Sequence, residues 1–496
     1  MQTITNRFTF LFRSTKGLVL VAIALVSVTT AIFGTLSGPM VEWGVKDVVV
    51  KLLGMKLVEA EREGRIIMLY HSIAMSIVAL EVYLITASVP MKRTEQTNIN
   101  AIVTVGYITS LIFGLLFAYW GRNWIAHGLF IFGQSVIFLA GLLLAKALWP
   151  WRREYMSRPP IYAHGPGGLD LERVAFFTMA VATLGSAIFG AVAGSFFGNG
   201  FQSFLAENVI RQPEKSALEL AVIGHLHIML TLIAVALLLL VGRWLDYKGP
   251  LHKWSMPLLI VGTILVTLGV WLVVPFETVA HYVIYAGSVP MLLSALLLVI
   301  YGWRRLIRER LVELGIQKAS PRQRLRALLH DPLKFGALWQ MVYMNFVTSF
   351  IGIFMAIRLD KVIRQWPFRE ERITLTGHWH MLSAIIATII LLYYADMIGL
   401  KGRARQWFGW LVIIGSDVAL GAAAVFATKR LYVTESGQQP LVDLVMALTD
   451  IGLAIVLVVL ALLMLWRLVD LFKSRGRWAA ELAEAEEAQS TQEVCR

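Results

Sequence analysis

The chain has 496 residues, of which 57% are hydrophobic and only 16% are charged, and its formal net charge at pH 7 is +13. A soluble enzyme rarely reaches this composition, which indicates an integral membrane protein. We expect the positive charge to reflect membrane topology, and we expect no nucleic-acid partner. The only cysteine, Cys495, excludes disulfides and thiolate metal clusters.

A helix of about 20 apolar residues crosses the roughly 30 Å hydrocarbon core of a bilayer. We predict twelve such spans, in chain order at residues 17–38, 65–90, 100–120, 126–148, 174–197, 218–241, 254–275, 279–302, 336–357, 374–398, 407–428 and 442–466. The predicted fold class is all-α integral membrane, with one transmembrane domain over residues 1–475 and a short cytoplasmic tail over residues 476–496. The first stretch lacks a small-x-small cleavage site, so we expect an uncleaved first span.

The loops between the spans predict the orientation of the chain. An even number of spans places both termini on one side of the membrane, and Lys and Arg are concentrated in the loops on that side. The positive-inside rule then predicts cytoplasmic termini and a multi-pass protein of the inner (cytoplasmic) membrane, in contact with membrane lipids.

Most of the histidines fall at the predicted outer ends of the spans. An imidazole in hydrocarbon is costly without a partner, so each is a candidate site residue. These histidines are His71 in the second span, His127 in the fourth, His225 and His227 in the sixth, His281 in the eighth, and His378 and His380 in the tenth. We interpret His127 as an interfacial histidine among tryptophans and not as a ligand.

Two of these spans begin with Gly-His-x-His, at residues 224–227 and 377–380. Side chains at positions i and i+2 of an α-helix point about 200° apart, so the two rings of one pair face different neighbours. We therefore expect each ring of a pair to serve a different cofactor. The alternative is two hydrogen-bonded histidines that face water at the membrane edge, and the second copy of the motif makes this alternative weaker.

The histidine-bearing stretches recur with a step of four spans. The segments that begin at Tyr70, His225 and His378 resemble one another and lie in the second, sixth and tenth spans. This period predicts three pseudo-symmetric four-helix arcs around a common axis, each adding one histidine-bearing helix to the centre.

Over nearly its whole length, the pattern of spans and histidines resembles subunit I of the heme-copper oxidase superfamily, which includes cytochrome oxidases and nitric oxide reductases. The resemblance implies that His71 and His380 are the axial ligands of a low-spin heme and that His378 is the proximal ligand of a second heme. We expect two or more hemes, of heme b type. It places His225 or His227 where the family has a ligand of its non-heme copper or iron.

The resemblance also implies a basic pair near the heme propionates. In the loop between the last two spans, the sequence FATKRLYV supplies Lys429 and Arg430. Cations at this place would neutralise carboxylates at the membrane surface. The alternative is an ordinary interfacial anchor.

The chain departs from the family at the non-heme metal site. The seventh span lacks the family's adjacent His-His pair, and Glu277 and His281 are the only ligand types nearby. One possibility is that the second heme has an imidazole on both faces, from His378 and one sixth-span histidine, and that the remaining histidine joins His281 at a third heme or a bare metal. The other is an open second heme beside a non-heme iron held by a sixth-span histidine, Glu277 and His281. We favour the first.

Acidic and basic residues add expectations about protons and partners. The acids Glu81, Asp417 and Asp450 lie inside predicted spans, where they form either a proton or quinol path or helix–helix hydrogen bonds. The outer segment AIRLDKVIRQWPFREERITLT is basic, which fits docking of an electron-transfer subunit of the cytochrome c or iron–sulfur type. The alternative is that this segment only closes over the hemes.

The sequence therefore predicts a respiratory membrane cytochrome that transfers electrons between a quinone or cytochrome c and a partner through bis-histidine hemes. Two alternatives stay open. One is a divergent nitric oxide or oxygen reductase with an altered non-heme site of iron or copper. The other is a transporter with a histidine-lined path, for which the sequence shows no broken mid-membrane helices.

Overall fold

The computed structural model describes residues 2–36, 41, 43–58, 62–156, 166–195, 217–358, 362–363, 366, 368–474 and 476–494. Cys495 and parts of the basic segment around residues 356–376 lie outside the described residues. Among the residues described, the secondary structure is helical, with no β-strand.

Twelve helical segments of this part of the chain are long and apolar enough to cross a membrane. The predicted all-α fold with twelve spans is thus confirmed. In chain order the spans are α2 (Thr15–Gly34), α4 (Arg62–Ser88), α5 (Arg93–Tyr119), α6 (Trp124–Ala147), α8 (Leu171–Ser195), α9 (Ala217–Trp244), α10 (Pro250–Leu272), α11 (Glu277–Glu313), the composite of α13 (Pro332–Val342), η4 (Tyr343–Thr348) and α14 (Ser349–Arg358), then α15 (Phe368–Met397), α16 (Gly402–Thr428) and α17 (Glu435–Phe472).

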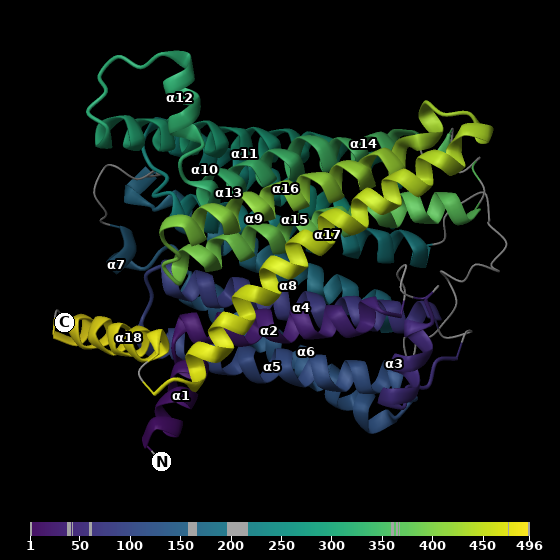
Figure 1. Cartoon of the computed structure of the whole chain (residues 1–496), viewed down its shortest axis with the longest axis horizontal. Coiled ribbons are helices and arrows are strands. Elements are labelled where there is room, and N and C mark those ends of the chain that lie inside the picture. Colours follow the sequence, from purple (N-terminus) through teal and green to yellow (C-terminus); the bar gives the residue numbers. More distant parts are fainter. Residues whose placement is uncertain are drawn as a thin grey trace.

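Shorter helices lie at the two ends of the bundle. They are α1 (Gln2–Arg13), α3 (Val45–Leu53), α7 (Arg153–Met156), η3 (Pro166–Gly168), α12 (Pro321–Leu328), η6 (Lys429–Leu431) and α18 (Arg477–Val494). The N-terminal helix α1 and the C-terminal helix α18 lie at the same end, together with α7 and α12 (Figure 1). We call this end the terminal side, and the opposite end, where α3 lies, the histidine side.

Local sequence explains where several spans begin. The side chain of Asn123 accepts hydrogen bonds from the backbone N–H groups of Ile125 and Ala126 at the start of α6. Asp331 caps α13 in the same way, and a proline occupies the first turn of α13. Such caps satisfy N–H groups that have no partner inside the helix, which matters most at a membrane boundary.

Small residues allow consecutive spans to pack closely. A Cβ built on Gly133 of α6 would stand 2.6 Å from the backbone nitrogen of Ser110 on α5. A Cβ on Gly452 of α17 would stand 2.5 Å from the carbonyl oxygen of Gly415 on α16. In a bilayer, close backbone contact of this kind is a main source of helix association, since lipid supplies no hydrophobic drive between helices.

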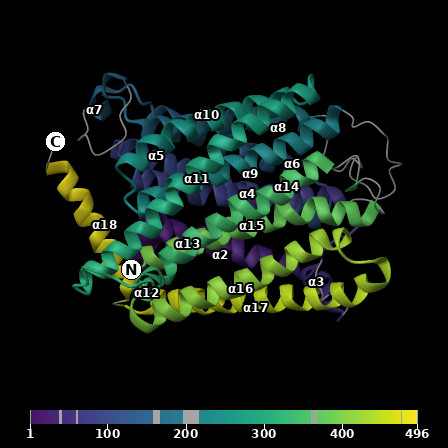
Figure 2. The same cartoon turned by 90° about the horizontal axis from the view of Figure 1, so that it is seen from above.

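The three spans that carry the predicted heme ligands, α4, α9 and α15, lie next to one another. Helix α9 contacts both α4 and α15, and the Tyr70 hydroxyl on α4 is hydrogen-bonded to Nε2 of His380 on α15. Seen from above, these helices run through the middle of the bundle, with α8 and α10 on one side and α16 and α17 on the other (Figure 2). The period of four thus corresponds to three neighbouring helices, while the arrangement in three symmetric arcs stays a prediction.

Helix α17 differs from the other spans in length and direction. It has 38 residues, or about 57 Å at 1.5 Å per residue, nearly twice the thickness of the hydrocarbon core. It runs diagonally across the other helices in Figure 1. A helix this long fits a bilayer by tilting or by extending beyond it.

Candidate functional site

The first pair of candidate residues joins α4 and α9. The rings of His71 and His225 have their centres 6.3 Å apart and their planes within 11° of parallel. Nδ1 of His71 is hydrogen-bonded to the carbonyl oxygen of Ile67 at 2.8 Å, and Nδ1 of His225 to the carbonyl oxygen of Ser186 on α8 at 3.1 Å. A carbonyl only accepts, so Nδ1 carries the proton in both rings.

A second pair joins α9 and α15. The ring centres of His227 and His378 are 5.8 Å apart, with 36° between the planes. Nδ1 of His227 donates to the carbonyl oxygen of Ile223 at 2.8 Å. Nε2 of His227 accepts a hydrogen bond from the indole N–H of Trp379 at 3.3 Å, so a metal bound at this atom would replace that bond.

The third contact joins α15 back to α4. The rings of His380 and Tyr70 have their centres 5.4 Å apart, at 70° to one another, and the hydroxyl is hydrogen-bonded to Nε2. His378 therefore faces α9 and His380 faces α4, as the i, i+2 spacing predicts. The ring that stacks beside His71 is that of His225. The expected pairing of His71 with His380 stays a prediction.

The histidine-bearing ends of these helices differ in exposure. Tyr70, His227 and His380 are exposed side chains, although each contacts a ring on a neighbouring central helix. His378 in contrast is 7% exposed.

The chemistry of these imidazoles fits an iron porphyrin. A metal-binding histidine typically donates one ring N–H to a backbone carbonyl and binds the metal with the other nitrogen, and His71, His225 and His227 all make this donation through Nδ1. Two imidazoles on opposite faces of one metal have their ring centres roughly 6 Å apart, given a metal–nitrogen bond of about 2 Å. The separations in the two histidine pairs are compatible with this value.

The proposed non-heme ligands lie at the start of α11. Glu277 is in the first turn of α11 and is half-buried. The ring of His281 lies 6.3 Å from that of Tyr285, one turn further along the same helix. The three ring contacts described above include neither residue. Within the described ranges, no group of three or more His, Cys, Asp or Glu side chains lies close enough to hold a metal ion.

The basic pair lies in η6, directly after α16. Lys429 is buried, and its ammonium nitrogen lies 4.3 Å from the centre of the Phe426 ring. The guanidinium of Arg430 lies 6.0 Å from the ring centre of Trp366. Both cations thus have an aromatic neighbour on the histidine side. His127 is also beside aromatic rings there, 4.8 Å from Phe117 and 5.8 Å from Trp124.

The acids inside the spans differ in their surroundings. Asp417 on α16 accepts hydrogen bonds from the side chains of Trp339, at 2.9 Å, and Gln340, at 3.1 Å, both on α13. Asp417 thus makes a hydrogen bond between two helices, which is one of the two roles expected for the acids inside the spans, the other being a proton or quinol path. Asp450 is half-buried on α17. Glu81 on α4 is 4% exposed, and within the described part of the chain its Oε1 has no hydrogen-bond partner.

Sequence reasoning missed three residues that contact the candidate ligands. Tyr70 and Trp379 are hydrogen-bonded to His380 and His227, respectively, and Gly190 of α8 lies against His225. Adjacency to a histidine was the only available signal for Tyr70 and Trp379. Gly190 is far from His225 in the sequence and gives no such signal.

Comparison of the chain with protein-family models and with curated proteins found no match in either set. The resemblance to heme-copper oxidase subunit I therefore depends on the number of spans, the histidine positions and the basic pair alone.

Proposed function

We propose that this chain is a heme-b-binding membrane cytochrome, similar in plan to subunit I of heme-copper oxidases, that transfers electrons through bis-histidine hemes. The observation that carries the proposal is the set of imidazole contacts between α4, α9 and α15. Helices with no chemical task at this place would not need five histidines at one level of a membrane, where each is costly.

The two histidine pairs support one assignment of the ligands. His71 with His225 would hold one heme, and His227 with His378 would hold the other. A heme with imidazole on both faces is six-coordinate and supplies electron transfer, not gas binding. The surrounding chain would orient these rings through the carbonyl oxygens of Ile67, Ser186 and Ile223.

The proposed orientation of the chain determines where its redox partners bind. The basic loops on the terminal side favour cytoplasmic termini in the inner (cytoplasmic) membrane, which puts the hemes toward the outer face. Lys429 and Arg430 would then neutralise heme propionates. Electrons would come from a quinone or cytochrome c, and an accessory electron-transfer subunit would dock near the basic segment around residues 356–376.

The optical spectrum of the purified full-length chain tests this proposal. We expect sharp low-spin bands on reduction, two b-type hemes per chain by pyridine hemochrome assay, and no shift with carbon monoxide. A carbon-monoxide-reactive heme together with a non-heme metal in elemental analysis would support a divergent nitric oxide or oxygen reductase. A colourless protein from heme-replete cells would support a transporter.

A matched pair of variants connects the spectrum to the site. His378→Ala removes a proposed ligand on α15, whereas His127→Ala removes a histidine that lies among aromatic rings on α6. We expect the first variant to lose one heme per chain and the second to keep both. Equal heme content in the two variants would contradict the assignment.

A further inference from the structure

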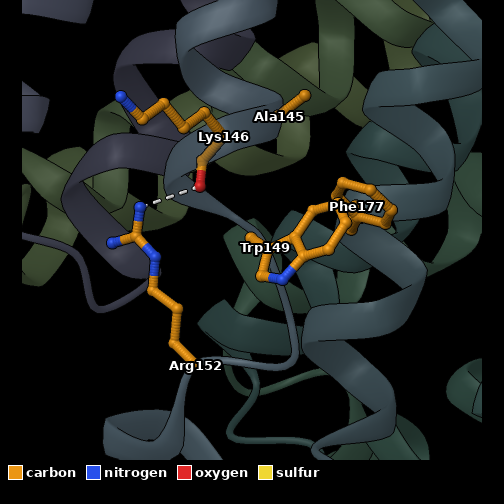
Figure 3. A pocket seen from close by; sticks show the side chains of 5 residues that line it. All are labelled: Ala145, Lys146, Trp149, Arg152 and Phe177. Atoms are coloured by element: carbon orange, nitrogen blue, oxygen red, sulfur yellow. Dashed lines mark hydrogen bonds between the residues drawn. The ribbon is translucent and has the colours of Figure 1, made fainter.

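A cavity at the terminal side lies at the opposite end of the bundle from the proposed heme ligands. It has a volume of about 480 Å³ and is lined by Ala145, Lys146, Trp149, Arg152 and Phe177. These residues come from the last turn of α6, from the segment that follows it, and from the second turn of α8 (Figure 3). Span α6 ends at Ala147 and span α8 begins at Leu171, so the cavity lies where the hydrocarbon core meets the polar membrane surface.

Two cationic side chains lie beside the cavity, whose lining is itself mostly apolar. In Figure 3 the ammonium of Lys146 and the guanidinium of Arg152 extend to the same side. Arg152 is held by Glu95, through hydrogen bonds of 3.3 and 2.9 Å, and by the carbonyl oxygen of Lys146 at 3.0 Å. The hydrogen bond to Glu95 raises the pKa of Arg152, so the guanidinium stays charged.

Lys146 supplies the cation that no acid compensates. Its side chain is exposed, and among the residues that the structure describes no carboxylate pairs with it. The charge of Arg152, in contrast, is matched by Glu95 at 2.9 Å and by Glu154 at 3.7 Å. An anion that entered the cavity would therefore meet a free ammonium beside an arginine that is already fixed in place.

Part of the lining is aromatic. The ring of Trp149 lies 5.3 Å from Phe177 and 5.0 Å from Trp151. Trp149 is 47% exposed and Trp151 is 52% exposed. Tryptophans at a membrane surface place the ring among acyl chains and the indole N–H among headgroups. Trp149 thus adds exposed aromatic surface to the cavity that Lys146 borders.

We propose that this cavity binds one anionic phospholipid, with the phosphate at Lys146 and an acyl chain along Trp149, Phe177 and Ala145. A free phosphate would use the cation alone and leave the aromatic lining exposed, whereas a lipid contacts both. The neighbouring Lys92, Arg93 and Arg153 add positive charge, which favours an anionic over a zwitterionic headgroup. This site is independent of the proposed hemes.

Native mass spectrometry of the full-length protein tests the proposal, with phosphatidylglycerol as the probe. The test variant is Lys146→Gln with Trp149→Leu. The chain offers a matched control, Lys253→Gln with Trp254→Leu, because Lys253 and Trp254 are an exposed lysine–tryptophan pair in the first turns of α10, at the same end of the bundle. The variant Lys146→Glu adds a charge reversal at an exposed position.

We expect the wild type and the control to bind one phosphatidylglycerol at least fivefold more tightly than the double variant does, and Lys146→Glu to bind it more weakly still. We also expect phosphatidylcholine to bind about fivefold more weakly than phosphatidylglycerol in the wild type and in the control, but not in the double variant. Equal loss in the control pair, or equal binding of the two lipids, would overturn the proposal. So would displacement of the lipid by millimolar inorganic phosphate, which would indicate a free-anion site, or by a quinone.

Discussion

The imidazole of His225 on α9 lies directly against Gly190 on α8. A Cβ built on Gly190 would stand 2.1 Å from Cε1 of the ring and 2.3 Å from Nδ1. Ser186, one turn earlier on α8, accepts the hydrogen bond from that same Nδ1. Residues four apart share one face of a helix, so a single face of α8 both leaves room for the ring and fixes its orientation.

Gly190→Ala should therefore displace His225 without changing any polar group. An added methyl cannot occupy the volume of the ring, so the ring must change its position relative to His71. We expect heme content to fall from two per chain to one, measured by pyridine hemochrome assay on the purified protein.

The same helix supplies the control for this experiment. A Cβ on Gly194, one turn further along α8, meets no atom within 4 Å, so Gly194→Ala should keep both hemes. Full heme content in Gly190→Ala, together with loss of a heme in His380→Ala, would assign the partner of His71 to His380, as the resemblance to heme-copper oxidases implies.

The directions of the histidines could be predicted from the sequence, but their partners could not. A rotation of about 100° per residue is a local property of any α-helix, so His378 and His380 must face different neighbours wherever α15 lies. Which ring meets them depends on the rotation and tilt of α4 and α9. Tertiary packing sets both, and no periodicity within one helix records them.

The ninth span shows a second limit of the sequence. Residues 336–357 predict one continuous helix, whereas the structure has a π-helical stretch, Tyr343–Thr348, between α13 and α14. A π-helical turn makes i→i+5 hydrogen bonds and rotates the following helix relative to the preceding one. Hydropathy fixes the length of a span, but it carries no signal for one extra residue per turn.

The buried acid Glu81 provides a prediction about stability. Its carboxyl group lies inside α4 with Oε1 unpaired within the described residues, and an unsatisfied buried polar group costs about 1–3 kcal/mol. Glu81→Leu should therefore raise the free energy of unfolding, or leave it unchanged, in thermal unfolding followed in detergent.

Glu172 is the matched control, because it is equally buried but paired with Arg243 at 3.0 Å. Glu172→Leu leaves the half-buried Arg243 without its carboxylate, and we expect destabilisation by about 1–3 kcal/mol. Similar destabilisation in both variants would mean that pairing of the carboxylate does not determine how much each glutamate contributes to stability. If Glu81→Leu is more stable but slower in quinol-driven heme reduction, the carboxyl group of Glu81 has a functional role.

Arg173, which is 1% exposed, joins the terminal ends of three spans. It donates to the carbonyl oxygen of Pro90 after α4 at 2.8 Å and to that of Ala147 at the end of α6, and its guanidinium lies 3.6 Å from the ring centre of Tyr155. Arg173→Met removes the charge and leaves the buried Ala147 carbonyl unpaired, whereas Pro90 is exposed. We expect a loss of about 1–3 kcal/mol in thermal unfolding, the cost of one unsatisfied buried group. Substitution of the exposed Arg403 by Met should change stability by less than about 0.5 kcal/mol.

The C-terminal helix α18 is attached to the last span through a buried arginine. Arg467 of α17 is fully buried and donates to both carboxylate oxygens of Glu481 on α18, at 3.3 and 2.6 Å. The carboxylate of Asp470 accepts the backbone N–H groups of Arg477 and Trp478 at the start of α18. The docking of α18 therefore combines these buried charges with the packing of Trp478 and Leu482, which are buried as well.

Glu481→Gln should release α18, because it leaves the Arg467 charge buried without its main partner, at a cost of about 3–5 kcal/mol. We expect faster hydrogen exchange across residues 477–487 with the spans unaffected. The exposed pair of Lys16 and Glu484, at 3.1 Å, is the control, and Glu484→Gln should cost less than about 1 kcal/mol. Replacing both Arg467 and Glu481 with Met and Leu should recover most of the protection, since the buried charge is then absent. If the double variant exchanges as fast as Glu481→Gln, packing of α18 against α1 and not the buried charge governs the docking.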